Sequence, residues 1–192
     1  MKKISTFLSI AILAGSVNLR AAQALQTVDQ VDLNQYIGKW YEVASIPQAF
    51  QKKCVKNTTA EYSFGEKDLV SVINSCTKEN GDVNIAEGAA RVEDRNTNAK
   101  LKVTFVKLFG WVFTLGGNYW IIDLDTHYQY AVVGDPTREY AWILSRTPSI
   151  DMKTLEGIHQ RLKNNKYDTC KILTSIQDGG FSERKPLCSL FQ

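Results

Sequence analysis

Short β-rich runs recur along the chain from Trp40 to Ser145, and turn residues separate each run from the next. Runs of this length, rich in β-branched and aromatic residues and bounded by Gly, Asn, Asp or Pro, are typical of strands. The eight runs are Trp40–Ile46, Thr58–Phe64, Leu69–Ser75, Val83–Val92, Leu101–Val106, Tyr119–Leu124, Tyr128–Val133 and Tyr140–Ser145. Their even spacing predicts an antiparallel β-sandwich or an up-and-down β-barrel.

The segment after the last run has helical periodicity. Ser149 or Asp151 is placed to cap a helix that begins near Met152. One face of this helix carries apolar residues at helical spacing, namely Leu155, Ile158 and Leu162. Cys170–Ile176 then indicates a short ninth strand. Because this order is not an alternating βαβ series, it excludes a parallel nucleotide-binding sheet and predicts an all-β domain with one C-terminal α-helix.

The N-terminus has the features of a secretory signal peptide. A basic start is followed by the apolar stretch Ile4–Val17, and Ala22-Gln23-Ala24 supplies a small-x-small cleavage site. The apolar stretch is too short to span the roughly 30 Å of bilayer hydrocarbon, which disfavours a membrane anchor. We therefore expect a cleaved signal peptide over residues 1–24 and a single exported domain over residues 25–192.

A lipoprotein-like stretch, Leu13-Ala14-Gly15-Ser16, has Ser16 at the position of the lipid-modified cysteine. Since no cysteine lies nearby, a thioether lipid anchor is excluded at this site. The expected location is the periplasm or the exterior, in possible association with the outer membrane but without a lipid anchor.

Charge and histidine content exclude two classes of function. The net charge of +3 arises from Lys2, Lys3 and Arg20, which all lie in the expected signal peptide. The remaining chain is neutral, so nothing favours nucleic-acid binding, which requires phosphate neutralisation. The two histidines, His127 and His159, stand apart from each other and from the cysteines, which match no zinc spacing. We expect neither a metal nor a cofactor.

Alternate side chains on the strands of a closed barrel point inward. This rule predicts an apolar and aromatic interior with a few tyrosine hydroxyls. The side chains expected to line it are Ala44, Ala60, Tyr62, Val72, Val103, Phe105, Tyr119, Ile121, Tyr140 and Trp142. A barrel of about eight strands either fills its core or holds one small ligand, and alternation alone leaves both possibilities open.

Three motifs appear in a fixed order along the chain. Gly38-Lys39-Trp40 matches G-x-W, the stretch around Asp125 has a looser match, and Arg146 lies at the end of the last barrel strand. Together they resemble the signature of the lipocalins, in the branch of bacterial lipocalins and apolipoprotein D, over about residues 30–177. The resemblance implies an eight-stranded up-and-down barrel that binds a small hydrophobic ligand without catalysing a reaction.

The resemblance also assigns structural roles to Gly38, Trp40, Asp125 and Arg146. Trp40 would plug the closed end of the barrel, with the Arg146 guanidinium over its indole. Cation–π attraction would stabilise this contact. A planar guanidinium stacks better than an ammonium and still reaches nearby carbonyls. We expect this pair to have no ligand-binding role.

The strand directions implied by the resemblance place the connection Lys107–Gly117 at the open mouth. Phe109, Trp111 and Phe113 alternate along it. An apolar rim normally marks a binding surface, so we expect a ligand-entry lip or a peripheral membrane contact. The alternative is a loop that folds over the mouth and buries these side chains.

Four cysteines in an exported chain indicate two disulfides. With the strand directions of the resemblance, Cys54 and Cys76 both fall at the open end, which favours Cys54–Cys76 with Cys170–Cys188. The rival arrangement, Cys54–Cys188 with Cys76–Cys170, is closer to apolipoprotein D and stays open.

The expected function is binding, transport or storage of a fatty acid, lysophospholipid or similar lipid inside the barrel, in a bacterial cell envelope. Four lysines near the mouth can meet a polar head or simply be solvated, namely Lys52, Lys53, Lys56 and Lys107. A lipid-modifying enzyme is the first alternative, but Glu42 and Asp123, the carboxylates nearest the interior rows, have no histidine beside them. An envelope-stress protein with a filled barrel is the other. A monomer or a weak dimer is expected.

Overall fold

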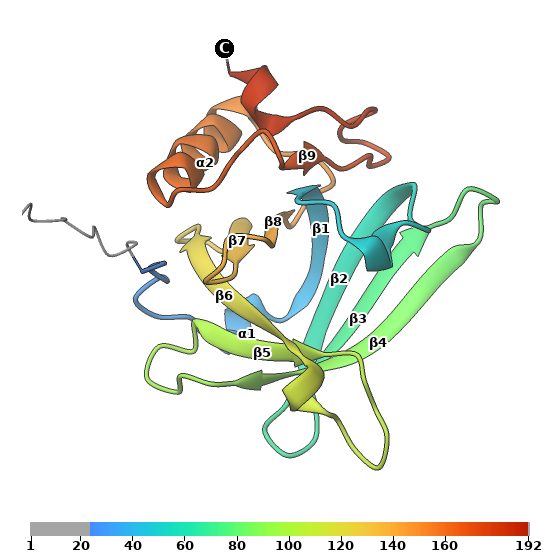
Figure 1. Ribbon diagram of the computed structural model, residues 1–192, viewed down its shortest axis with the longest axis vertical. Helices are drawn as coiled ribbons and strands as arrows, with labels where there is room; N and C mark the ends of the chain where they lie inside the picture. The colour runs from blue at the N-terminus through green and yellow to red at the C-terminus, as the bar shows by residue number, and fades with distance from the viewer. Residues whose placement is uncertain (1–23, 192) are drawn as a thin grey trace, which may run out of the picture.

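The computed structural model describes residues 24–191, and its strands form one closed antiparallel sheet (Figure 1). Each of β2 to β7 pairs with the next strand along the chain, β8 pairs with β1, and β1 pairs with β2. The strands are β1 (Gly38–Ser45), β2 (Lys56–Phe64), β3 (Val70–Thr77), β4 (Val83–Val92), β5 (Lys100–Thr104), β6 (Gly117–Leu124), β7 (Tyr130–Gly134), β8 (Ala141–Ser145) and β9 (Leu173–Thr174). The eight-stranded up-and-down barrel is confirmed, and the sandwich is excluded.

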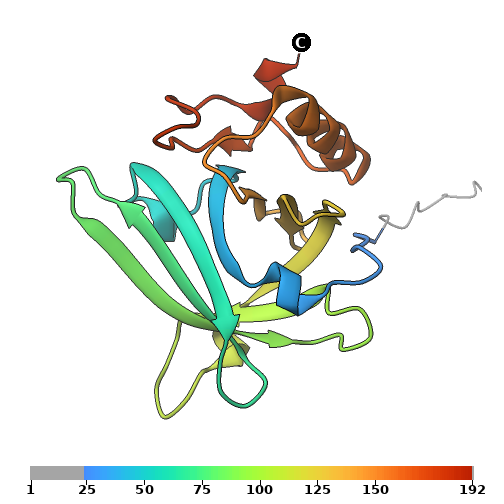
Figure 2. The same cartoon turned by 180° about the vertical axis from the view of Figure 1, so that it is seen from behind.

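The predicted C-terminal helix is α2 (Met152–Asn164), and Asp151 caps it by accepting a hydrogen bond from the Thr154 amide. Its apolar face packs on the outside of the barrel wall, as Figures 1 and 2 show from two sides. This outer cluster joins Leu155, Ile158 and Leu162 of the helix to Val43, Val132 and Ile143 of the strands. Burial of one helical face therefore fixes α2 against β1, β7 and β8.

Strand β1 changes partner halfway along its length. Its first half pairs with β2, and its last two residues pair with β9, which consists of only two residues of the predicted ninth strand. Beyond β9, the Asn57 amide donates to the carbonyl of Ile176. The segment after α2 therefore lies between the upper parts of β1 and β2.

Alternation predicts Ala44 inside the barrel, and this prediction is wrong. Between Glu42 and Ala44 the pairing of β1 with β8 shifts by one residue, which reverses the inward and outward positions beyond it. Ala44 therefore pairs with Ile143 and packs in the outer cluster. An extra residue in one strand has this effect because the side-chain period of a strand is two. Ser45 pairs with Trp142 and faces inward in its place.

The N-terminal part of the described chain crosses the closed end of the barrel. Leu25 is buried, the Val28 amide donates to the carbonyl of Ile121, and the Val31 amide donates to that of Thr97. The short helix α1 (Leu33–Tyr36) follows and leads into β1. The predicted signal peptide lies, apart from Ala24, outside the described residues.

Both disulfides follow the first of the two expected arrangements. Cys54 is bonded to Cys76 and Cys170 to Cys188, with Cα separations of 5.5 and 4.9 Å. The first joins the β1–β2 connection to β3, and the second ties the C-terminal segment to itself. No helix among residues 24–191 is long and apolar enough to cross a membrane.

Candidate ligand-binding site

The base of the barrel is a plug built around Trp40. Its ring is fully buried, and its indole nitrogen donates to the carbonyl of Tyr36 at 2.8 Å. The guanidinium carbon of Arg146 lies 3.7 Å from the ring centre. The same guanidinium donates to five backbone carbonyls at the base, those of Gln35, Tyr36, Ile37, Lys39 and Tyr128. All three of its nitrogens donate to backbone carbonyls at the closed end, which gives the guanidinium a structural role.

Two further motif residues shape this plug. Gly38 has φ of +97° and lies under the guanidinium, where a Cβ would approach an Arg146 nitrogen to 3.4 Å. A side chain at Gly38 would therefore strain the backbone, and its Cβ would be in contact with the guanidinium. The Asp125 carboxylate accepts from the amides of His127 and Gln129, which fixes the turn that carries Tyr128. The motif residues thus position the closed end.

A layer of tyrosines lies beside the plug and spans the barrel. Tyr62 of β2 and Tyr119 of β6 meet with their hydroxyl oxygens 2.9 Å apart, and Tyr36 reaches Tyr119 from below at 2.8 Å. Burial raises the pKa of Tyr62 to about 12 and raises those of Tyr36 and Tyr119 well above their usual value. The three side chains are therefore neutral hydroxyls at any physiological pH.

Below and around this layer the interior is packed. Val72, Leu101, Ile121, Val133 and Leu144 are all buried in the same cluster as Trp40. Val103 packs against them with partial burial. Of the side chains expected to line a cavity, Val72 and Ile121 therefore belong to the filled lower half, and Tyr62 belongs to the tyrosine layer.

The upper half of the interior is open instead. Phe105 and Tyr140 face inward by alternation yet are 43% and 37% exposed, and Trp142 is only partly buried. Ala60 is also partly buried, but it pairs with Trp40 and packs against the plug. Strand register adds Asn74 and Ala86, which lie beside Ala60 on neighbouring strands and which the alternation had not singled out. Apolar side chains that face an interior and still meet solvent define a cup above the tyrosine layer.

Small residues on one wall make room in this cup. Gly88 of β4 faces Phe105, and a Cβ there would lie only 2.8 Å from the ring. Across the cup, Tyr140 stacks on Trp142 with ring centres 6.0 Å apart. Glycine and alanine on β2 and β4, opposite aromatic rings, keep the two walls from meeting at this height.

The two carboxylates considered for catalysis are both engaged elsewhere. Glu42 is buried and accepts hydrogen bonds from Ser45, Gln51 and Ser175, which ties β1 to the β1–β2 connection and to the C-terminal segment. Asp123 forms an ion pair with Arg161 of α2 outside the barrel. Neither has a histidine partner among the hydrogen bonds of residues 24–191. Groups of His, Cys, Asp and Glu that could hold a metal are also absent from that range.

The rim connection between β5 and β6 projects apolar side chains into solvent. Leu108 is 74% exposed, and Phe109 at its tip is fully exposed. Trp111 lies under the Lys107 ammonium, 4.9 Å from ring centre to nitrogen. Phe113 packs on the outside of the barrel under Arg91, so it is less available for contact with a ligand or a membrane than expected. The alternative in which this loop buries itself over the mouth is excluded.

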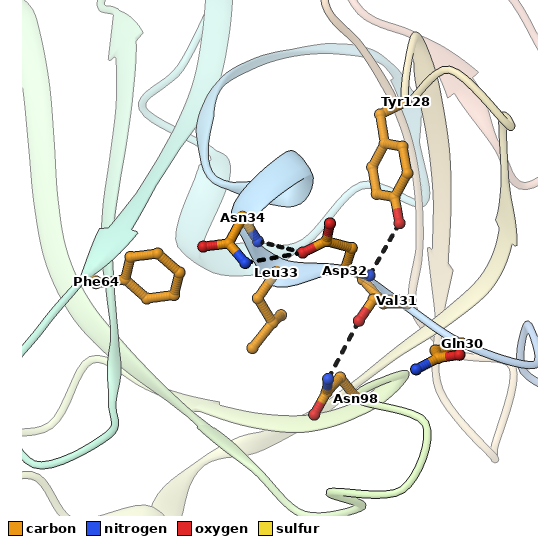
Figure 3. Close-up of a pocket in the computed structure, with 8 residues that line it drawn as sticks. All are labelled: Gln30, Val31, Asp32, Leu33, Asn34, Phe64, Asn98 and Tyr128. Atoms are coloured by element: carbon orange, nitrogen blue, oxygen red, sulfur yellow. Dashed lines mark hydrogen bonds between the residues drawn. The ribbon is translucent and has the colours of Figure 1, made fainter.

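A second hollow, of about 650 Å³, lies outside the closed end (Figure 3). It forms where the N-terminal segment crosses the base. Most polar groups in it are paired with one another: the Asp32 amide donates to the Tyr128 hydroxyl, Asn98 donates to the carbonyl of Val31, and Asn34 donates to Asp32 (Figure 3). Such pairing holds the segment in place and leaves the cup as the better candidate site.

A sequence model of the lipocalin-like domain matches residues 31–177. The chain belongs to the lipocalin family. Temperature-induced lipocalin-1 of Arabidopsis thaliana is 35% identical over 150 residues, covering 77% of this chain and 80% of the relative. The outer membrane lipoprotein Blc of Vibrio cholerae is 33% identical over 175 residues, covering 90% and 97%. Rat apolipoprotein D is 32% identical over 157 residues, covering 78% of each chain.

Solved lipocalin structures share the fold. Insecticyanin from the tobacco hornworm Manduca sexta superposes with a TM-score of 0.65 at 23% identity, covering 86% of this lipocalin and 95% of that chain. Lipocalins bind small hydrophobic ligands and are in general binding proteins, not enzymes. The resemblance inferred from the three motifs is thereby confirmed. The open upper half of the barrel is the part of this lipocalin suited to that role.

Proposed function

We propose that this lipocalin binds and carries a lipid such as a fatty acid or a lysophospholipid, with the acyl chain in the cup and the polar head at the mouth. The observation that carries the proposal is the contrast between the packed lower half and the exposed upper half of the interior. Each methylene buried there contributes about 0.8 kcal/mol, so the sum over a long acyl chain offsets the cost of ordering the ligand.

The mouth suits a polar head. Lys52 and Lys53 are exposed on the connection that follows β1. Lys56 is already paired with Asp178 and Lys107 lies against Trp111, so these two are less available. A phosphate or carboxylate at the rim would meet the first two lysines while its chain occupies the cup. The expected signal peptide and the two disulfides favour a location in the cell envelope. The protein would be exported without a lipid anchor.

The test is recovery and titration of ligand. Native mass spectrometry of the protein purified from its own envelope, followed by organic extraction, should recover a lipid in stoichiometric amount. Titration with a fatty acid should quench the fluorescence of Trp142 in the cup. Ala86→Trp, which places a large ring on the inward face of β4, should abolish the binding, whereas Ile85→Trp, exposed on the outer face of the same strand, should not. Ligand-free protein with no quenching would favour a filled barrel.

The rim loop extends the proposal to a membrane surface. An exposed Leu-Phe tip beside a Lys–Trp pair has the composition of interfacial membrane contacts. Sedimentation with phospholipid vesicles should show Phe109→Asp binding at least about fivefold more weakly than the unaltered chain. Phe64→Asp, which alters an exposed phenylalanine at the closed end, is the matched control and should leave vesicle binding unchanged. Equal losses of vesicle binding in both variants would refute a membrane contact through the rim loop.

A further inference from the structure

Strand β4 has a partner on both of its edges only near its end. Its register with β3 runs from Val83 to Ala90, whereas its register with β5 includes only residues 89–92. No strand within the described residues pairs with the other edge of residues 83–88. Figures 1 and 2 show this part of β4 as the outermost ribbon of the sheet. Every second residue here turns its N–H and C=O away from β3, and we call residues 83–88 the free edge.

The free edge lacks the features that usually protect an exposed strand. Proteins discourage edge-to-edge pairing with lysine, proline or a bulge. Residues 83–88 contain no lysine, arginine or proline, and their pairing with β3 runs without a register shift. Val83 and Ile85 are β-branched and are 63% and 62% exposed on the outer face of the sheet. An edge of this composition is suited to the addition of another strand.

The order of side chains favours a second copy of the same segment as that strand. Two identical strands pair antiparallel about a two-fold axis, and the axis passes through one residue because directly opposed residues share a face. With the axis at Asn84, Val83 of each copy lies opposite Ile85 of the other. The four exposed side chains then form one apolar cluster. Glu87 lies opposite Gly81 in this register, whereas an axis at Ile85 would oppose Glu87 to Val83.

We propose that this lipocalin forms a two-fold dimer in which the free edges of two copies pair antiparallel, so that the two sheets become continuous. The paired stretch is short, and its area is below the roughly 1,200 Å² that stable complexes bury, so the dimer should dissociate on dilution. Asn84 and Ala86 belong to the inward face of β4, in the part of the wall that β5 does not reach. Pairing would support this wall of the cup, whichever ligand the cup holds.

Sedimentation velocity of the disulfide-bonded protein between about 10 μM and about 1 mM tests the dimer. The sedimentation coefficient should rise with concentration from the monomer value toward the dimer value. Val83→Lys/Ile85→Lys places like charges directly opposite one another and should keep the protein monomeric throughout. Both side chains are largely exposed, so this variant should fold, which circular dichroism verifies.

Leu108→Lys/Phe109→Lys is the matched control, because it changes two exposed apolar residues of the rim loop in the same way. This variant should dimerise like the unaltered chain. A protein that stays monomeric at every concentration would overturn the proposal. So would a dimer that is lost in the rim-loop variant and kept in the edge variant.

Engineered cysteines read the register of the pairing. In the proposed dimer the two Asn84 residues are directly opposite, with Cβ atoms about 5 Å apart, within reach of a disulfide after small adjustments. Asn84→Cys should therefore form a covalent dimer on mild oxidation, seen by non-reducing electrophoresis and intact mass. Glu87→Cys, about 20 Å from its copy in this register, should stay monomeric. No covalent dimer of Asn84→Cys, or equal cross-linking of both variants, would contradict the edge pairing.

Discussion

Arg146 and Trp40 are stacked at the base of the barrel, with the guanidinium carbon 3.7 Å from the centre of the indole ring. Trp40 lies in β1 and Arg146 directly follows β8, its neighbour in the sheet, so the stack lies where the barrel closes upon itself. The guanidinium also satisfies carbonyls from the end of α1 and from the turn before β7. One side chain therefore links the end of β8 to the end of α1 and to the turn before β7.

This arrangement predicts a large effect for Arg146→Lys. An ammonium retains the charge but cannot stack flat while it donates to five carbonyls, so several of these carbonyls lose their partner. We expect the free energy of unfolding to fall by about 2–4 kcal/mol. Urea denaturation followed by tryptophan fluorescence measures it. Arg95→Lys, at an exposed residue with only a long contact to Asp68, should change stability by less than about 0.5 kcal/mol.

The tyrosine layer predicts an unusual order of stabilities. Tyr119→Phe leaves the hydroxyls of Tyr36 and Tyr62 both without a partner and should destabilise the fold by about 2 kcal/mol. Removal of either outer hydroxyl leaves one hydrogen bond intact and should have a smaller effect. The triple variant Tyr36→Phe/Tyr62→Phe/Tyr119→Phe leaves no unmatched group, so it should recover stability relative to Tyr119→Phe. Thermal unfolding would contradict this account if the three losses simply added.

The strands, the helix and their order followed from the sequence because period-two and period-3.6 patterns report which face is buried. The three motifs also placed the plug, since Trp40 and Arg146 lie at fixed points of that pattern. Alternation failed at Ala44 because the bulge after Glu42 depends on the C-terminal segment that packs beside β1. No local signal in the sequence records that contact.

The depth of the cup could not be predicted from the sequence either. Whether Tyr62 and Tyr119 meet across the axis depends on the stagger of strands that are four apart in the sheet, which alternation does not specify. Tyr36 precedes β1, so the alternation rule for strands could not identify it as part of the tyrosine layer. Its place two residues before the G-x-W motif is the one sequence feature that could have assigned it to the closed end.

The disulfides predict separate stability losses. The two loops they close have similar lengths, with sequence separations of 22 and 18, so each bond should stabilise the fold by about 3 kcal/mol through the unfolded chain. Cys76 is buried while Cys170 is exposed, so Cys54→Ala/Cys76→Ala should cost more than Cys170→Ala/Cys188→Ala. Calorimetry of the two double variants measures the difference. Identical losses would mean that burial of Cys76 contributes nothing.

His159 predicts how stability responds to pH. It is buried between α2 and the C-terminal segment, where one ring nitrogen bonds to Thr169 and the ring stacks on Phe191, 5.2 Å between centres. Burial, assisted by nearby Lys163, lowers its pKa below the usual 6.5. The unfolded chain therefore binds a proton at a higher pH than the folded chain does. The native state loses stability as the pH falls below the usual histidine pKa of 6.5. Above it, this contribution is constant.

Urea denaturation at a series of pH values between about 8 and 5 tests this, because paired carboxylates begin to titrate only at lower pH. The free energy of unfolding should be level in the upper part of the range and should decline below about pH 6.5. His159→Gln should flatten the decline, since glutamine does not titrate. His127→Gln removes an exposed histidine and should leave the decline in place. A decline that survives His159→Gln would come from other groups and would contradict this account.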